Sequence, residues 1–214
     1  TMRASILVLG SMVAKYGYAK IALPGGCAIG SRPVNYHLKA LEKLGAEISL
    51  KNGYIEAKSK KLIGADIEFE GVTVTGTENL MMAATLAEGK TTLTNVAKEP
   101  EISDLADFLN SMGAKISGAG TDEIIIKGVK ELKGTTFKIP ADRIEAGTYL
   151  VAAALTNGKI TVKKIDSNRM GAIIETLQKA GAEVNLSEDS ISLDMKNNTP
   201  VSYTHLRAHE TATY

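Results

Sequence analysis

The chain has 214 residues, 44% of them hydrophobic, which is enough to bury the core of one large domain or of one domain and part of another. Its 25 basic and 24 acidic residues are mixed along the chain, so no basic stripe indicates nucleic acid or an anionic membrane as a partner. No apolar run approaches the ~18 residues of a membrane helix and no signal peptide is visible, so we expect a cytoplasmic protein.

The first predicted elements are an apolar helix, a stop at Gly17 and a strand, within residues 5–23. The same succession returns in residues 79–93 and 148–162, which resemble each other closely. The first copy is the loosest of the three. A pattern that recurs in this way is typical of a fold built from repeated units.

A second motif alternates with the first, in residues 41–48, 109–116 and 177–184. Its glycines are 68 residues apart both times and stand where a helix C-terminus favours a left-handed residue. Each copy ends an apolar helical pattern, and a strand follows, as in residues 123–126 and 190–193. We therefore predict that the three glycines occupy equivalent helix ends.

The two motifs together define a unit of two helices and several strands, and three units cover most of the chain. Such units bury their helices against one another and leave the sheets outside. The sequence thus predicts an α/β repeat fold and not a doubly wound sheet.

One connection breaks the repeat. The two motif glycines are 28 positions apart in the first unit, against 24 and 23 in the other two. The additional residues belong to the stretch Pro24–Pro33, which contains Cys27, the only cysteine of the chain. Functional residues collect on loops that a rigid scaffold holds, so this loop is the candidate site.

The residues of this loop suit anion chemistry. Ser31 is a plausible N-cap and Pro33 suits the first turn of the helix that follows, whose free N–H groups would attract an anion. The planar guanidinium of Arg32 can bind phosphate or carboxylate in two places. Together they would favour the thiolate of Cys27, which could act as nucleophile or proton donor.

Structural alternatives stay open at this point. Cys27 could be a small buried hydrophobe, Arg32 a solvated cation and Arg3 an ordinary surface arginine. A single cysteine excludes an internal disulfide, and a redox-sensing thiol would lack a resolving partner. The three histidines are dispersed, so no metal site is predicted.

Other polar and apolar residues have plain structural interpretations. By the repeat, His37 matches Leu105 and Ile173, which lie on core faces, so we expect a packing role for it. Met81 and Met82 lie inside an apolar helix, and both are expected to fill the core. Arg143 follows the junction between the second and third units, where a salt bridge is as good an interpretation as a ligand contact.

Five strings of the sequence, taken together, resemble the enolpyruvyl transferase family, in its branch that acts on UDP-N-acetylglucosamine. They are residues 1–5, 23–34, 75–79, 98–102 and 142–148. The likeness runs from residue 1 to about residue 197. The string Pro-Gly-Gly-Cys-x-Ile-Gly-x-Arg-Pro is the most specific part, since the related shikimate-pathway enzymes share the fold without this cysteine loop.

The resemblance implies an inside-out α/β barrel, or prism, made of repeated helix and strand units and truncated here at both ends. Residues 1–141 would be part of a first domain that carries the cysteine loop, and residues 142–199 the start of a second. Residues 200–214 match neither the family nor the repeat. They are interpreted as translated adapter or vector sequence, with a genuine divergent tail as the alternative.

The resemblance also implies a reaction. The enolpyruvyl group of phosphoenolpyruvate is transferred to the 3-hydroxyl of UDP-N-acetylglucosamine with release of phosphate, the first committed step of peptidoglycan synthesis. The two small molecules are the implied partners, and no metal or organic cofactor is implied. The family's N-terminal Lys-Asn pair, Asp base and C-terminal arginines have no match here, so the chain alone is expected to be inactive. The alternative is a non-catalytic module that binds a sugar nucleotide or an anion.

Site residues follow from the same resemblance. Cys27 would be the general acid toward the phosphoenolpyruvate methylene and could form a covalent adduct, while Arg32 and Arg3 would bind anionic groups. The UDP-sugar site would be lined by Pro33, Val34, Asn35, Tyr36, Gly71, Val72, Thr73 and Val74, the last four partly through backbone. Many relatives have Asp at the position of Asn35, whose amide can still donate and accept hydrogen bonds.

Overall fold

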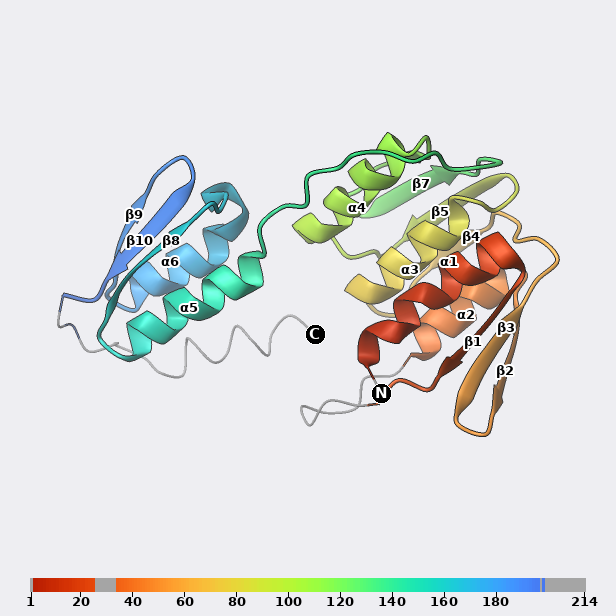
Figure 1. The fold of residues 1–214 in the computed structure, drawn as a ribbon, viewed down its shortest axis with the longest axis horizontal. Helices are drawn as coiled ribbons and strands as arrows, with labels where there is room; N and C mark the ends of the chain where they lie inside the picture. Colours follow the sequence, from red (N-terminus) through yellow and green to blue (C-terminus); the bar gives the residue numbers. More distant parts are fainter. Residues whose placement is uncertain (1, 26–33, 197, 199–214) are drawn as a thin grey trace. The chain divides into compact units, whose positions relative to one another are not determined.

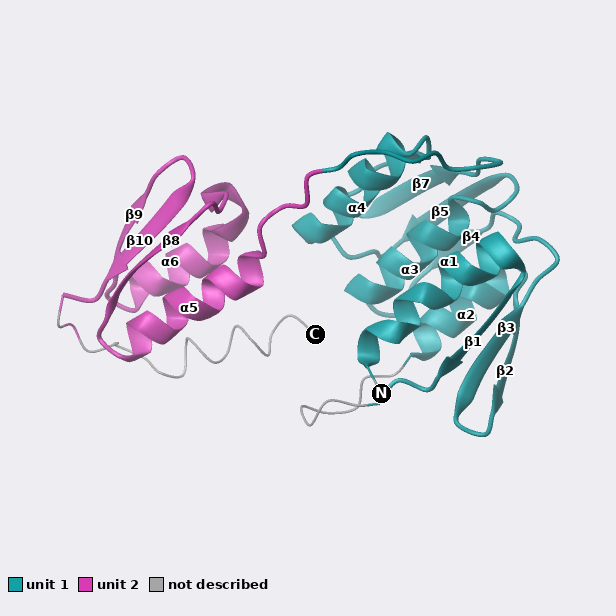
Figure 2. Ribbon diagram, viewed as in Figure 1, with its two compact units in different colours: residues 1–137 teal, residues 138–214 magenta. Residues whose placement is uncertain are grey.

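The computed structural model describes residues 2–25, 34–196 and 198. The chain divides into two compact units, residues 1–137 and residues 138–214, which Figure 2 shows in different colours. Each unit is described by itself. Cys27, Arg32 and Pro33, and the suggested cap Ser31, lie outside the described residues, as does the whole of the predicted tail, residues 200–214.

Unit 1 alternates helices and strands along the chain (Figure 1). In order, they are the 3-10 helix η1 (Arg3–Ile6), α1 (Leu7–Tyr16), β1 (Tyr18–Ala22), α2 (Asn35–Lys43), β2 (Glu47–Lys51), β3 (Tyr54–Lys58), β4 (Asp66–Glu68), α3 (Val74–Ala84), β5 (Lys90–Thr94), α4 (Pro100–Ser111), β6 (Lys115–Ser117) and β7 (Glu123–Lys127). The stretch between β1 and α2 spans residues 23–34, against residues 95–99 between β5 and α4, so the first connection is the longer, as predicted.

Helix α3 lies at the centre of unit 1. It packs against α1, α2 and α4, and seven of its eleven residues are buried, which fits its apolar character on nearly every side. Leu80 and Met81 are fully buried there, and burial of such side chains contributes about 1.5–3 kcal/mol each. The expected core role of Met81 is confirmed.

The sheets of unit 1 cover this helical layer from outside (Figure 1). One sheet has the order β1-β3-β2 and contacts α1 and α2; the other has the order β4-β5-β7-β6 and contacts α3 and α4. Alternation along β7 shows why, since Ile124 and Ile126 face the helices and Glu123 and Lys127 face outward. Helices inside and sheets outside is the predicted inside-out arrangement.

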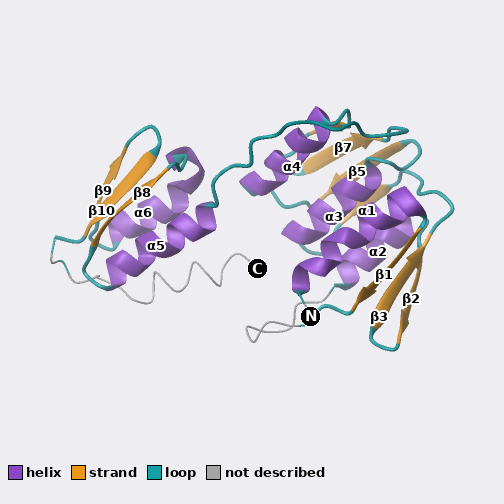
Figure 3. Ribbon diagram, in the orientation of Figure 1, coloured by secondary structure: helices purple, strands orange, loops and turns teal. Residues whose placement is uncertain are grey.

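Unit 2 repeats the same pattern on a smaller scale. Its elements are α5 (Arg143–Leu155), β8 (Lys159–Lys163), the 3-10 helix η2 (Ser167–Met170), α6 (Gly171–Lys179), β9 (Glu183–Leu186) and β10 (Ser190–Asp194). Helices α5 and α6 lie on one face of the sheet β8-β10-β9, which Figure 3 shows by element type. Asp142 caps α5, because its carboxylate accepts hydrogen bonds from the N–H groups of Ile144 (2.8 Å) and Glu145 (3.1 Å).

The strand orders confirm the three repeated units. In β1-β3-β2, β5-β7-β6 and β8-β10-β9, the first strand of each unit pairs with its third, and the third with its second, always antiparallel. Strand β4 is an addition to the second of these repeated units, within unit 1, and pairs in parallel with β5.

The three motif glycines end equivalent helices, as the 68-residue spacing predicts. Gly45, Gly113 and Gly181 have φ of 89°, 100° and 100°. Each donates to the carbonyl three residues before it, and the following alanine donates to the carbonyl five residues before itself, as Ala46 does to Leu41 at 3.1 Å. This pair of bonds is the Schellman arrangement, which satisfies the last carbonyls of a helix.

The other motif is confirmed with one variation. Gly17 (φ 71°) directly ends α1, and Gly89 (φ 94°) precedes β5 after a short turn. In the third copy Asn157 (φ 53°) takes the left-handed conformation in place of the glycine that follows it, which asparagine tolerates better than most residues. Across the described ranges, none of the helices is both long and apolar enough to span a membrane.

Candidate active site

The described residues of the predicted site lie on three separate segments of unit 1. Arg3 begins η1, Val34 to Tyr36 form the entry and first turn of α2, and residues 71–74 lead into α3. Val72 is 59% exposed and Asn35 is exposed, whereas Arg3, Tyr36 and Gly71 are half-buried.

Two of these segments touch at Tyr36 and Gly71. A Cβ added to Gly71 would lie 3.2 Å from the Tyr36 hydroxyl oxygen, so the ring rests directly on the glycine. Beside this contact is a hollow of about 60 Å³ between α2 and the chain after β4, which Tyr36 and Lys43 help to line. Lys39 bonds Glu70 across it at 2.6 Å. The predicted UDP-sugar residues of α2 and of the loop before α3 therefore lie together.

In the loop before α3, the last residue is hydrogen-bonded to the helix, whereas the backbone of the two residues at its start is not bonded to any described residue. Thr73 is the N-cap of α3, and its hydroxyl accepts a hydrogen bond from the Gly76 N–H at 3.2 Å. The backbone groups of Gly71 and Val72 make no hydrogen bond to any other described residue. They are available to a ligand, as the expected backbone contacts to uridine require.

A buried polar cluster lies beneath the site. The Asn79 side chain in α3 accepts from the Gly10 N–H (2.9 Å) and donates to the Ile6 carbonyl (3.1 Å). It also contacts Nδ1 of His37 at 3.1 Å, while Nε2 of His37 lies 3.4 Å from the Thr75 hydroxyl. The cluster ties α1, α2 and α3 to one another.

Arg3 lies close enough to this cluster for its positive charge to repel a proton on His37. Burial, and then the Arg3 guanidinium, lower the pKa of His37 to about 4. His37 is 1% exposed, so its expected packing role is confirmed, and the polar partners around it are an addition to that prediction. In the sequence Asn79 stands out only as the last residue of the family string 75–79. A polar residue inside an apolar helix is the signal that could have singled it out.

The geometry suits an anionic ligand. The His37–Thr75 contact joins the first turn of α2 to the first turn of α3, so two helix N-termini, with their free N–H groups, lie side by side. Arg3 adds a full positive charge at the same end. Within the described part of the chain, no group of three His, Cys, Asp or Glu side chains is placed to hold a metal ion.

The fold is similar to that of solved enolpyruvyl transferases. The structure is similar to the enolpyruvyl transferase NikO from Streptomyces tendae, with a TM-score of 0.73 at 18% identity over 89% of this chain and 46% of that one. It is also similar to EPSP synthase from Acinetobacter baumannii, with a TM-score of 0.63 at 21% identity over 90% of this chain and 46% of that one. These likenesses concern the fold, and they confirm the expected inside-out α/β architecture.

The chain belongs to the EPSP synthase (3-phosphoshikimate 1-carboxyvinyltransferase) family, whose model matches residues 1–210. This confirms the expected family of carboxyvinyl transferases. The match reaches into the stretch 200–214, which the sequence assigned to a tail without family likeness.

Two curated relatives point to one branch of the family. The chain is 57% identical over 197 residues to the UDP-N-acetylglucosamine 1-carboxyvinyltransferase of Hydrogenovibrio crunogenus, covering 92% of this chain and 47% of the relative. It is 62% identical over 200 residues to the protein of the same name from Vesicomyosocius okutanii, covering 94% and 48%. The chain spans about half the length of these relatives.

Proposed function

We propose that the protein transfers the enolpyruvyl group of phosphoenolpyruvate to the 3-hydroxyl of UDP-N-acetylglucosamine. The observation that carries the proposal is the identity of 57% and 62% to two relatives named for this reaction, over more than nine-tenths of the chain. The described site supports it, because Arg3, two helix N-termini and the backbone of Gly71 and Val72, which bonds no other described residue, suit a sugar nucleotide with a diphosphate.

The proposed chemistry conserves all atoms. The sugar 3-hydroxyl gives its proton to a base and its oxygen forms a bond to C2 of phosphoenolpyruvate, while C3 takes up a proton. A proton is then lost from C3 and phosphate leaves C2, which restores the double bond. Cys27 donates the proton to C3, and Arg32 with Arg3 holds the anionic groups. Pro33, Val34, Asn35 and Tyr36 line the UDP-sugar site, and residues 71–74 hold the uridine.

The proposed reaction belongs to peptidoglycan synthesis in the cytoplasm. Catalysis of this kind closes two domains over the reacting groups and excludes water.

The test is phosphate release from phosphoenolpyruvate by the protein expressed from its complete reading frame. We expect release that requires UDP-N-acetylglucosamine, is not supported by 3-phosphoshikimate, and falls by about 10²–10⁴-fold in Cys27→Ala. Release that depends on 3-phosphoshikimate would assign the other acceptor named by the family. Release that survives Cys27→Ala unchanged would remove the assigned role of that residue.

A further inference from the structure

The side chain of Asn79 sits where three segments of the candidate site meet, although it lines no part of the site itself. It is fully buried in α3, and its amide reaches η1–α1, which carries Arg3, and α2, whose first turn carries Asn35 and Tyr36. The loop that supplies Gly71 to Val74 leads directly into α3, eight to five residues before Asn79. One side chain thus connects all three segments.

The backbone fixes which way the Asn79 amide faces. Gly10 offers an N–H, which can only donate, so Oδ1 of Asn79 must face it at 2.9 Å. Ile6 offers a carbonyl, which can only accept, so Nδ2 must face it at 3.1 Å. Gly10 and Ile6 are four residues apart, the spacing of a helical hydrogen-bond pair, at the joint between η1 and α1.

The amide orientation then fixes the tautomer of His37. The second proton of Nδ2 points at Nδ1 of His37, 3.1 Å away, so Nδ1 must accept and carries no hydrogen. The ring proton is therefore on Nε2, where it is donated to the Thr75 hydroxyl at 3.4 Å. Protonation of Nδ1 would set two donors against each other, and the pKa of His37, lowered to about 4 by burial and then by Arg3, agrees with a neutral ring.

We infer that Asn79 is a positioning residue for the UDP-sugar site: it locks His37 in the Nε2–H form and sets Arg3, the first turn of α2 and the loop before α3 in their mutual places. The inference rests on the proposed function for the identity of the ligand. It does not rest on it for the tautomer, which is a property of the protein alone. Asn79 acts through its neighbours and touches no reacting atom.

The test uses Asn79→Asp, which keeps the shape and the acceptor for Gly10 but loses both donated protons. A carboxylate facing Nδ1 favours its protonation, so nitrogen chemical shifts should show His37 protonated at Nδ1 and its pKa raised by roughly 1–3 units. The dissociation constant for UDP-N-acetylglucosamine, measured by calorimetry on the protein from its complete reading frame, should rise by roughly 10- to 100-fold.

The matched control is Thr85→Val at the C-cap of the same helix. Thr85 is equally buried, and among the described residues its hydroxyl bonds only the Met81 carbonyl of α3, at 2.8 Å. This variant should keep both the His37 tautomer and the affinity of the wild type, even if it is destabilised as much as Asn79→Asp. Equal affinity in Asn79→Asp and Thr85→Val would overturn the positioning role.

Two further outcomes separate the claims. A wild-type protein in which His37 is protonated at Nδ1 would refute the inference without any variant, so the test does not depend on Asn79→Asp folding. A wild type that fails to bind UDP-N-acetylglucosamine, while Asn79→Asp still shifts the His37 proton, would contradict the proposed ligand and leave the tautomer lock of Asn79 confirmed.

Discussion

The interiors of the two units differ, although both are built from the same helix and strand pattern. Among the described residues of unit 1, six polar residues are buried: His37, Thr77, Asn79, Thr85, Thr91 and Thr92. In the described part of unit 2 the buried side chains are all apolar, such as Leu150 and Ile191. At the position of Asn79 in the repeat, unit 2 has Thr148, which is exposed and bonds only the Ile144 carbonyl of its own helix, at 2.8 Å.

The difference shows that the same helix and strand pattern can bury polar side chains in one unit and only apolar ones in the other. Helix α3 is enclosed by three helices, so a polar side chain there must find partners on them, whereas α5 packs within its unit on α6 and one sheet. His37 and Asn79 connect α1, α2 and α3 near the segments that carry the candidate site, whereas Thr85 caps the other end of α3. The buried polar groups that join helices to one another are therefore found in the unit that carries the candidate site.

The largest effect is expected from a substitution that removes the centre of the buried polar cluster. Asn79→Ala removes three buried hydrogen bonds and leaves a cavity, so we expect a loss of about 4 kcal/mol in the free energy of unfolding. Thr148→Ala, at the matching position of unit 2, should cost less than about 1 kcal/mol. Urea unfolding of both variants measures the contrast, and equal losses would mean that the two interiors do not differ in this respect.

The second effect is a pH dependence that only unit 1 should show. His37 has a pKa of about 4 in the folded protein and about 6.5 in the unfolded chain, so between these values the unfolded state binds more protons. The contribution is fully present above pH 6.5 and is lost as the pH falls to about 4, by an amount near 3 kcal/mol. The difference between wild type and His37→Gln, followed by urea unfolding from pH 7 to pH 4, isolates it. Parallel curves for the two proteins would count against the neutral buried ring.

The third effect tests how closely α1 approaches α3. A Cβ on Gly10 would lie 2.5 Å from Oδ1 of Asn79 and 3.0 Å from Cβ of Ala83, so Gly10→Ala should destabilise the protein by about 2 kcal/mol. In unit 2, Gly171 begins α6 with nothing within 4 Å of its would-be Cβ. Gly171→Ala should be neutral or stabilise by about 0.5 kcal/mol. Thermal melting decides, and a harmless Gly10→Ala would show that the helices are not in tight contact.

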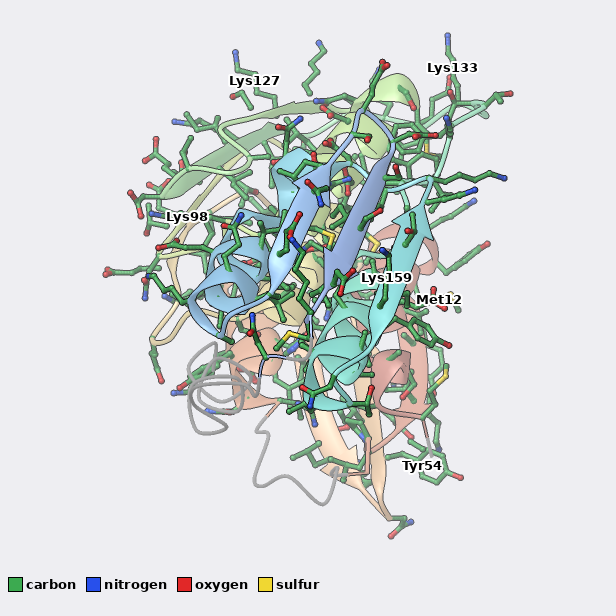
Figure 4. The ribbon with its side chains drawn as sticks, turned by 90° about the vertical axis from the view of Figure 1, so that its left-hand side faces the viewer. Met12, Tyr54, Lys98, Lys127, Lys133 and Lys159 are labelled. Atoms are coloured by element: carbon green, nitrogen blue, oxygen red, sulfur yellow. The ribbon has the colours of Figure 1, made fainter. Side chains whose placement is uncertain are left out.

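The smallest effect concerns the outer faces of the sheets. In unit 1, Lys127 on β7 pairs with Lys90 on one side and Lys115 on the other, three like charges in one row. At the equivalent place in unit 2, Asp194 pairs with Lys159, and their side chains meet at 3.0 Å. Figure 4 shows Lys127 extending away from the ribbon, so its charge is screened by solvent.

Reversal of that central charge should relieve the repulsion. Lys127→Glu should stabilise the protein by about 0.5 kcal/mol at low salt, and less at high salt. Lys133→Glu makes the same change of net charge outside the row and serves as the control. Stabilisation of the same size in both variants would attribute the effect to net charge and not to the row of lysines.

The sequence predicted the repeated helices and strands well, because the residues that mark where they end act locally. The equal spacing of Gly45, Gly113 and Gly181 reports a backbone conformation that each glycine adopts by itself, and all three were found as expected. The cluster around Asn79 depends on contacts between residues 69 and 73 positions apart, which no local pattern encodes. The repeat did indicate that His37 is buried, since its counterparts are apolar, but not what it binds.

Mapping the ligand onto the chain tests the central claim most directly. UDP-N-acetylglucosamine, titrated into isotope-labelled protein expressed from its complete reading frame, should shift the NMR signals of Arg3, Val34 to Tyr36 and Gly71 to Val74. 3-Phosphoshikimate should leave these signals in place. Shifts of the same residues by both ligands, or by neither, would contradict the assignment of this part of unit 1 as the UDP-sugar site.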